Sequence, residues 1–489
     1  MPLPGAGLAN DPIPSFPMPP SSSTPRVFTR IAWLLVAASA ALLAGSVDVS
    51  GWGFNVDGLT RVMAVIVTTI SAIVHSFARR YMAGDRHIGR FYRRLFALTG
   101  VVLLLTAADH AALFTVLWLA MGWTLSTLIG HVQDWAPARG AERLARRSFL
   151  GSSAALASAV GLLVAETGTW SIAGIVDAAP TLPASVQIGS GLLLLTAAMI
   201  QSALVPFQTW LLSSMTAPTP VSAFMHAGIV NAGGVLLARF APVLVESSGV
   251  MQAVFVAGAA SAFLGQAWMM VQTDIKRQLG CSTVAQMGFM VLQCGLGFFA
   301  AAITHLILHG FYKAYFFLAS GSGIQLSRPS SNEKSASALG TVTAAAAAVA
   351  GGVLFAWITG KSITGWTGGT VLTIFVVLAV LHATLTVVDR TPLSPLARAF
   401  AIPVMILSSI GAYAAVYLGI SALLIGLPGV ATPASLSPIH AGTVLLFAAA
   451  YVAVERGWHR SFHGLYAWLV TSSQPAASAV TSRRENYPS

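Results

Sequence analysis

The amino-acid sequence predicts an all-α polytopic membrane protein with about fourteen transmembrane helices, and three observations lead to this prediction. Of the 489 residues, 56% are hydrophobic and only 8% are charged, whereas about a quarter of the residues in an ordinary soluble domain are charged. Several apolar runs, such as 250–271 and 401–426, have the roughly twenty residues that a helix needs to cross a bilayer. Lys and Arg gather in alternate connections between these runs.

The apolar runs give the expected helices in chain order. Residues 1–25 are rich in Pro and Ser and lack the basic start and cleavage site of a signal peptide, so we expect a disordered cytoplasmic tail there. No linker divides residues 26–460, so we expect one transmembrane domain, followed by a cytoplasmic C-terminal tail at 461–489. The expected spans, each to within several residues, are 31–47, 58–77, 95–107, 111–131, 148–165, 187–204, 217–241, 250–271, 280–298, 299–322, 341–358, 370–388, 401–427 and 437–454.

The basic connections set the orientation of the helices. Short cytoplasmic loops of membrane proteins are enriched in Lys and Arg. Here six basic connections fall on one side of an alternating path, and the opposite connections are nearly uncharged or carry Asp48, Glu166 and Asp177. Both termini are therefore expected in the cytoplasm, and the formal net charge of +11 indicates topology and not nucleic-acid binding. The basic connections contain Arg79, Arg80, Arg86, Arg90, Arg93, Arg94; Arg139, Arg143, Arg146, Arg147; Lys276, Arg277; Arg328, Lys334; Arg390, Arg398; and the residues from Arg456 to Arg484.

Two segments break the helical pattern. In 201–210 a proline interrupts an apolar run, and in 357–366 two glycines and a lysine stand beside one. Proline removes a backbone donor, which a lipid environment tolerates only where protein or internal water satisfies the freed groups. Interrupted segments in corresponding positions of two halves point to an ion pathway between inverted repeats.

One apolar run contains a stripe of ionisable residues, which are rare and usually functional inside a membrane. His305, His309 and Lys313 recur every four residues, so on a helix they share one face with about 6 Å between successive members. Imidazole exchanges protons near neutral pH, so the stripe predicts a proton relay that faces the bundle interior. The alternative that stays open is that the three side chains only satisfy backbone carbonyls.

Three further residues are candidates for the same pathway, each with a structural alternative. His226 follows the first break and could equally be a buried histidine with satisfied ring nitrogens. Lys361, inside the second break, could be a terminal relay group or a lysine that reaches the membrane surface. Lys276 could be a relay group or a positive-inside anchor. Since no Gly-rich phosphate loop, metal-ligand spacing or nucleophile triad occurs, we expect an ion-conducting transporter subunit and no enzyme, metal or cofactor.

A set of short motifs runs through most of the chain, roughly residues 57–373. The motifs are Val56-Asp-Gly58, Pro206-Phe-Gln-Thr-Trp-Leu211, Ala217-Pro-Thr-Pro-Val-Ser-Ala223, Gln272-Thr-Asp-Ile-Lys-Arg277, Cys281-Ser-Thr283, His305-Leu-Ile-Leu-His-Gly-Phe-Tyr-Lys-Ala314 and Leu318-Ala-Ser-Gly-Ser322. Together they resemble the antiporter-like subunits of respiratory complex I and of related cation/proton antiporter complexes. The resemblance implies two inverted five-helix repeats with broken helices. It also implies a polar axis to which, by motif position, the following residues would belong: His226, Lys276, His305, His309, Lys313 and Lys361.

Two positions depart from that family. Its members carry a membrane glutamate where this chain has Leu119, and a lysine in the first broken helix where this chain has Gln201. The resemblance implies that this acid–base pair helps drive redox-coupled pumping, so its loss disfavours a complex I pump.

Residues 223–234, Ala-Phe-Met-His-Ala-Gly-Ile-Val-Asn-Ala-Gly-Gly, resemble the DabB branch of the family. The resemblance implies a subunit of the bacterial inner (plasma) membrane that accumulates inorganic carbon, as CO2 or bicarbonate, by conducting protons or Na⁺. A DabA-like cytoplasmic partner with a zinc site would hydrate CO2, so catalysis would lie on the partner. Two alternatives remain, a proton-pumping subunit of a complex I-type NADH:quinone oxidoreductase and a subunit of a multi-subunit Na⁺/H⁺ antiporter.

Overall fold

The computed structural model describes residues 23–45, 49–321, 338–363, 365–390, 395–430, 432–456 and 462–480. Within this part of the chain the structure is helical, apart from one antiparallel two-stranded hairpin. The predicted all-α class is confirmed. Residues 1–22 and 481–489 of the two predicted tails lie outside the described residues, as do Asp48, Arg328, Lys334 and Arg484.

Each of the fourteen predicted apolar segments overlaps a helix or an interrupted helix. The interrupted one consists of α9 (Thr219–Ala227), the 3-10 turn η3 (Ile229–Asn231) and α10 (Ala232–Arg239). The others are α1 (Thr24–Gly45), α2 (Gly58–Tyr81), α3 (Ile88–Ala107), α4 (Ala111–Ile129), α5 (Ala136–Thr167), α7 (Ala184–Gln201), α12 (Ser248–Met270), α13 (Ile275–Gly295), α14 (Phe299–Ala319), α15 (Ala338–Thr359), α16 (Gly368–Arg390), α17 (Pro395–Leu423) and α18 (Pro438–Glu455).

Length and composition identify many of these helices as membrane spans. In the described residues nine helices are long and apolar enough to cross a bilayer, with the interrupted segment Thr219–Arg239 counted as one of them. The chain is therefore a multi-pass membrane protein, while the number of fourteen crossings stays a prediction. The α14 helix is not among the nine, and it carries the ionisable stripe that the sequence predicted.

The first predicted break lies between α7 and the short helix α8 (Thr209–Ser213), which runs into the turn η2 (Ser214–Thr216). Side chains satisfy backbone groups that the break frees. Trp210 Nε1 donates to the Ile200 carbonyl at 2.8 Å, and Ser261 Oγ accepts from the Val205 amide at 3.1 Å. The second break is the connection between α15 and α16, and it begins at Gly360 in a left-handed conformation, with φ of 67°.

Several short elements have no counterpart in the sequence analysis. Strands β1 (Val49–Gly51) and β2 (Phe54–Val56) form the hairpin between α1 and α2. Two short helices, α6 (Ile172–Asp177) and α11 (Ala241–Val245), and the turn η1 (Ala179–Thr181) lie in other connections.

The predicted C-terminal tail contains two helices, α19 (His463–Ser472) and α20 (Ala477–Val480). They attach to the domain through hydrogen bonds from Trp268 Nε1 to Ser472 Oγ at 2.8 Å and from the Ala476 amide to Ser213 Oγ at 3.0 Å. This segment therefore packs against the transmembrane domain, which the sequence analysis did not predict.

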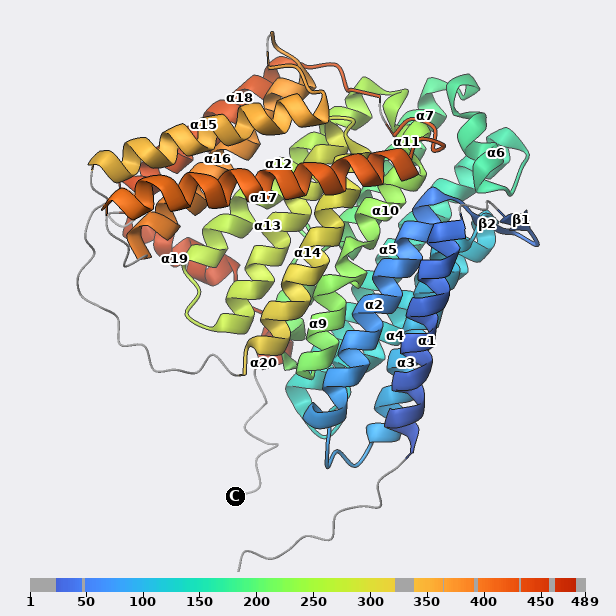
Figure 1. The fold of residues 1–489 in the computed structure, drawn as a ribbon. Coiled ribbons are helices and arrows are strands. Elements are labelled where there is room, and N and C mark those ends of the chain that lie inside the picture. Colours follow the sequence, from blue (N-terminus) through green and yellow to red (C-terminus); the bar gives the residue numbers. More distant parts are fainter. Residues whose placement is uncertain are drawn as a thin grey trace, which may run out of the picture.

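In Figure 1 the first five long helices stand side by side at one end of the molecule, and α9, α13 and α14 occupy its middle. The α15 and α17 helices lie side by side at the opposite end, and α17 continues from there across α14 and contacts α2. The middle is densely packed, because glycines such as Gly258 and Gly288 let the backbones of α12 and α13 approach closely. This packing fixes α13, which supplies partners to the candidate site.

Candidate functional site

Most of the ionisable stripe of α14 is buried. Lys313 is fully buried and His309 is 5% exposed, while Tyr312, Tyr315 and Phe316 near the C-terminal end of the helix are exposed. His305 is partly buried. The burial of this stripe follows from the four-residue spacing, which keeps the three side chains on one face.

Lys313 reaches across to the backbone of α13. Its Nζ donates a hydrogen bond of 3.0 Å to the carbonyl of Leu279. The same carbonyl accepts from Thr283 Oγ1 at 2.9 Å, one turn further along α13. A helix carbonyl that accepts a side-chain hydroxyl and an ammonium in this way holds the charge without a carboxylate partner.

His226, from the last turn of α9, completes this network. Its Nδ1 lies 2.9 Å from Thr283 Oγ1, and its ring stacks on Phe317 of α14 with centroids 4.3 Å apart. Because the Thr283 hydroxyl donates to Leu279, we assign the proton to Nδ1, which donates to the hydroxyl oxygen. His226 and Lys313 are thus linked through one hydroxyl and one carbonyl, while the buried Nε2 has no hydrogen-bond partner.

The two other histidines form a stacked pair on α14. The rings of His305 and His309 lie nearly parallel, at 13°, with centroids 6.1 Å apart. Both ring nitrogens of His309 and Nε2 of His305 are buried without a hydrogen-bond partner. Buried ring nitrogens normally have a partner, so these atoms are positioned to bond internal water.

The two remaining predicted lysines lie apart from this network. Lys276 stands in the first turn of α13, on the face of Leu279 and Thr283, and is partly exposed. Lys361 donates to the Tyr417 hydroxyl at 3.0 Å, and its ammonium lies 4.1 Å from the centre of the Phe298 ring. In the described residues neither lysine forms a hydrogen bond or ion pair with the stripe, whereas His226, His305, His309 and Lys313 lie on the packed helices α9 and α14.

The two substituted positions differ in their surroundings. Gln201 ends α7, is fully buried, and has both amide atoms without a hydrogen-bond partner. Leu119 of α4 is partly buried, beside Trp118, whose indole donates to Ser152 Oγ at 2.9 Å. Neither position holds an ionisable group, so the acid–base pair that the resemblance implies has no counterpart at these two positions.

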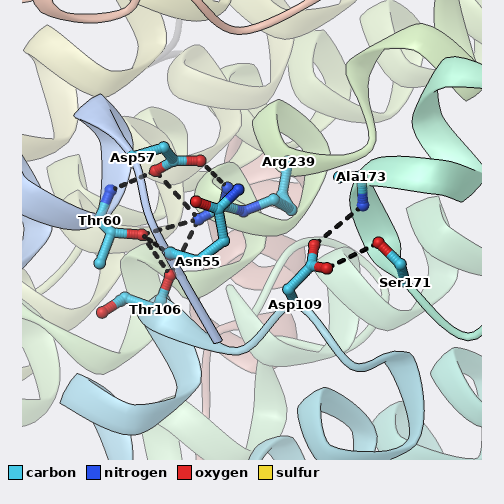
Figure 2. Close-up of polar contacts among 8 residues, drawn as sticks. All are labelled: Asn55, Asp57, Thr60, Thr106, Asp109, Ser171, Ala173 and Arg239. Atoms are coloured by element: carbon cyan, nitrogen blue, oxygen red, sulfur yellow. Dashed lines mark hydrogen bonds and ion pairs between the residues drawn. The ribbon is translucent and has the colours of Figure 1, made fainter. Parts of the chain in front are cut away.

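A second polar cluster, missed by the sequence analysis, lies at the other end of α10 (Figure 2). Arg239 forms an ion pair with Asp57, the residue that caps the N-terminus of α2, and also donates to Thr60 Oγ1 at 3.1 Å and to the Thr106 carbonyl at 2.9 Å. Nearby, Asp109 accepts hydrogen bonds from Ser171 Oγ at 2.7 Å. A signal for this cluster exists in the sequence: Arg239 ends an apolar segment on the side whose other connections lack basic residues.

Among the described residues no three His, Cys, Asp or Glu side chains gather as a metal site would require. The described groups of the site are hydrogen-bond donors and acceptors inside a helical bundle, and its imidazole and amine groups are of a kind that can bind protons.

Comparison with known families gives two matches. Residues 108–388 match the transmembrane family described as NADH:quinone oxidoreductase/Mrp antiporter, and residues 44–92 match the N-terminus of NADH-ubiquinone oxidoreductase (complex I) chain 5. The solved Mrp complex of Dietzia sp. has a chain with a TM-score of 0.58 and 24% identity, covering 90% of this chain and 57% of that one. A chain of the archaeal membrane-bound sulfane sulfur reductase has the same TM-score at 17% identity, covering 94% of each chain. These structures support the fold.

Curated relatives are more similar in sequence. The probable inorganic carbon transporter subunit DabB1 of Halothiobacillus neapolitanus is 40% identical over 285 residues, which is 57% of this chain and 51% of that protein. DabB of Bacillus anthracis is 40% identical over 279 residues, 56% of this chain and 54% of that protein. Subunit L of the NADH-quinone oxidoreductase of Mycobacterium tuberculosis is 36% identical over 287 residues, 58% and 45% of the two chains.

The aligned part spans about half the length of these curated relatives. Both the DabB proteins and the complex I subunit carry the resemblance that the motifs predicted. With more than half of its residues matching one family, the chain belongs to the NADH:quinone oxidoreductase/Mrp antiporter family of membrane subunits, in which it is similar to DabB.

Proposed function

We propose that this chain is the ion-conducting membrane subunit of an energy-coupled complex that accumulates inorganic carbon. In this proposal protons, or alternatively Na⁺, move through the chain, and a DabA-like cytoplasmic zinc protein hydrates CO2 to bicarbonate. In this proposal the flow of ions drives the hydration of CO2 and prevents its reversal. The relatives named as probable inorganic carbon transporter subunits support the proposal.

The observation that carries the conduction step is that His226 and Lys313 meet at one turn of α13, where they bond Thr283 Oγ1 and the Leu279 carbonyl. The carbonyl accepts from Thr283 and from Lys313 and relays no proton itself, so in this proposal the proton passes between the two groups through water. Imidazole can accept a proton at one nitrogen and release one from the other, and an ammonium can give up a proton to a neighbouring acceptor. His309 and His305 extend the row along α14. Water at their unpartnered ring nitrogens would connect the row, as a proton path requires.

The assignment of ion conduction to this chain and of CO2 hydration to the partner rests on the same polar residues. The polar residues at the site are proton carriers, and they do not form a nucleophile with its base and oxyanion donors. The hydration step is therefore placed on the partner. We further propose that the complex lies in the bacterial inner membrane with both termini of the chain in the cytoplasm, because the basic connections all fall on one side of the alternating helices.

A second candidate is a proton-pumping subunit of a complex I-type oxidoreductase or of a multi-subunit Na⁺/H⁺ antiporter. The similarity to subunit L favours it. Leu119 and Gln201 count against it, because a redox-driven pump of this family would need the glutamate and lysine that these residues replace. We therefore rank it second.

The proposal is tested by expressing the chain with and without the DabA-like protein of its own organism in a host that lacks carbonic anhydrase. Growth in air and uptake of labelled bicarbonate should require both proteins. Rescue by the chain alone, or CO2 hydration by the purified chain, would contradict the division of labour. Proteoliposomes with an imposed pH gradient or an imposed Na⁺ gradient identify the ion, and co-purification with NADH oxidation would favour the second candidate instead.

A further inference from the structure

Two small cavities lie end to end between α2, α3, α4 and the interrupted helix α9–η3–α10. The outer cavity extends from Arg239 to the helix interruption at Gly228. The inner cavity continues from Gly228 to Asn231 and to Leu306 of α14. The residues that line both cavities are Met63, Val67, Val102, Gly228 and Ile229. Because they share these walls, the two cavities are direct neighbours, and we call them together the route.

The inner end of this route reaches the turn that carries His226. Phe224 and Ala227, on either side of His226 in the sequence, line the inner cavity. Asn231 also lines it, and its Oδ1 is buried without a hydrogen-bond partner, while its Nδ2 donates to the Ala227 carbonyl at 2.7 Å. A buried polar oxygen without a partner on a cavity wall is a place for a water molecule.

The outer end is closed by the ion pair of Asp57 and Arg239. The Arg239 side chain is 10% exposed and that of Asp57 18%. The guanidinium is held on several sides at once, by Asp57, by Thr60 and by the Thr106 carbonyl (Figure 2). Between this pair and Asn231 the walls of the route are almost entirely apolar. A fixed positive charge at the entrance and a dry apolar passage behind it both oppose the entry of cations.

We propose that this route is an access path between the face opposite the basic connections and the buried Asn231 in the middle of the bundle, and that the Asp57–Arg239 pair is its closure. The inference deepens the proposed function and rests on it, since it assigns the conducted proton or cation a way in or out on that face. While the pair is intact the route is closed. Separation of the pair moves the guanidinium off the entrance and lets water enter the apolar passage.

The first test measures access to the route. Cys281 and Cys294 are buried, so the native thiols are replaced by Ala and a single cysteine is introduced at Ala232, on the outer cavity wall. Intact cells are exposed briefly to Ag⁺, a small thiol-reactive cation, and the thiols left over are counted with a biotinylated maleimide after denaturation. Ala232→Cys should react at least about tenfold faster with Arg239→Gln than with Arg239 intact, because this change removes the positive charge and the contacts of the guanidinium with Asp57, Thr60 and the Thr106 carbonyl. Ala253→Cys on α12, outside both cavities, is the matched control and should not change.

Equal reaction rates at Ala232→Cys in the two backgrounds, or no reaction in either, would overturn the closure. Membrane abundance and elution as a single peak verify folding. If Arg239→Gln does not fold, Arg239→Lys replaces it. The lysine keeps the charge and loses the fork of hydrogen bonds, so the reaction rate should again rise, by a smaller factor.

The second test fills the route. Met63 lines both cavities, so Met63→Trp should reduce ion flux in proteoliposomes at least about tenfold without loss of folded protein. Leu104→Trp, on the exposed side of α3, is the control and should leave flux unchanged. Equal flux in both variants overturns the route and leaves the proposed function standing. Absence of flux in the unmodified chain contradicts the proposed function, and the Ag⁺ experiment then still decides whether the route exists.

Discussion

Lys313 and Thr283 donate to the same backbone oxygen, the carbonyl of Leu279, at 3.0 and 2.9 Å. Since His226 contacts the Thr283 hydroxyl at 2.9 Å, the ammonium of α14 and the imidazole of α9 meet at one turn of α13. Polar groups of three helices, α9, α13 and α14, therefore contact one another inside an apolar bundle. A change in the charge of either end group alters the hydrogen bonding of the other, which is the behaviour that a proton path needs.

The first prediction concerns Lys313. Lys313→Met keeps most of the side-chain volume and deletes the ammonium, so the complex should assemble normally and fail to accumulate bicarbonate. Uptake of labelled inorganic carbon, normalised to membrane abundance, measures this. Gln201→Met is the matched control, because that position already lacks the lysine of related subunits, and it should have a much smaller effect. Uptake by Lys313→Met at the unmodified rate would make the stripe structural and place the proton path elsewhere.

The second prediction concerns Thr283. Thr283→Val has a similar shape and removes the hydroxyl, which leaves the His226 Nδ1–H unpaired in a buried site. An unpaired buried donor costs roughly 1–3 kcal/mol, so we expect ion flux in proteoliposomes to fall about tenfold with a modest loss of thermal stability. Thr283→Ser keeps the hydroxyl and should retain most of the flux. Equal flux in the Val and Ser variants would show that the hydroxyl does not connect the two charged groups.

The sequence could predict that His305, His309 and Lys313 share a face, because that arrangement follows from helix geometry alone. It could not predict the acceptor of Lys313, which is a main-chain oxygen 34 residues away and has no signature in the side chains. Hydropathy located the long helices and overlooked the β1–β2 hairpin, since a strand of three residues carries no periodic signal. These short elements nevertheless hold Asp57 beside Arg239.

The third prediction concerns Lys361, whose ammonium lies between the Phe298 and Tyr417 rings. Tyr417→Phe removes one hydrogen bond and keeps the aromatic face, so flux should fall only about two- to fivefold. Lys361→Met removes the charge and should reduce flux much more if Lys361 is the terminal group of the path. A stopped-flow pH assay with proteoliposomes compares the two. Unchanged flux in Lys361→Met would leave this lysine as a surface anchor.

The last prediction uses His131, which lies in the connection between α4 and α5, outside the spans. Its side chain is buried, Nε2 lies 3.2 Å from Asp85 Oδ2, and its ring packs against Phe91. Burial lowers the pKa of His131, and the Asp85 carboxylate offsets only part of this effect. The unfolded chain therefore binds this proton more readily than the folded protein. The contribution of His131 to the stability of the fold is complete above the ordinary pKa of about 6.5 and is lost as the pH falls below it.

The temperature at the midpoint of thermal unfolding, measured by scanning fluorimetry in detergent, should decrease as the pH is lowered from about 7.5 to about 5. His131→Gln should reduce this fall, and Asp85→Asn should increase it, because it deletes the group that raises the pKa. Identical curves for His131→Gln and the unmodified protein would show that another group sets the acid sensitivity.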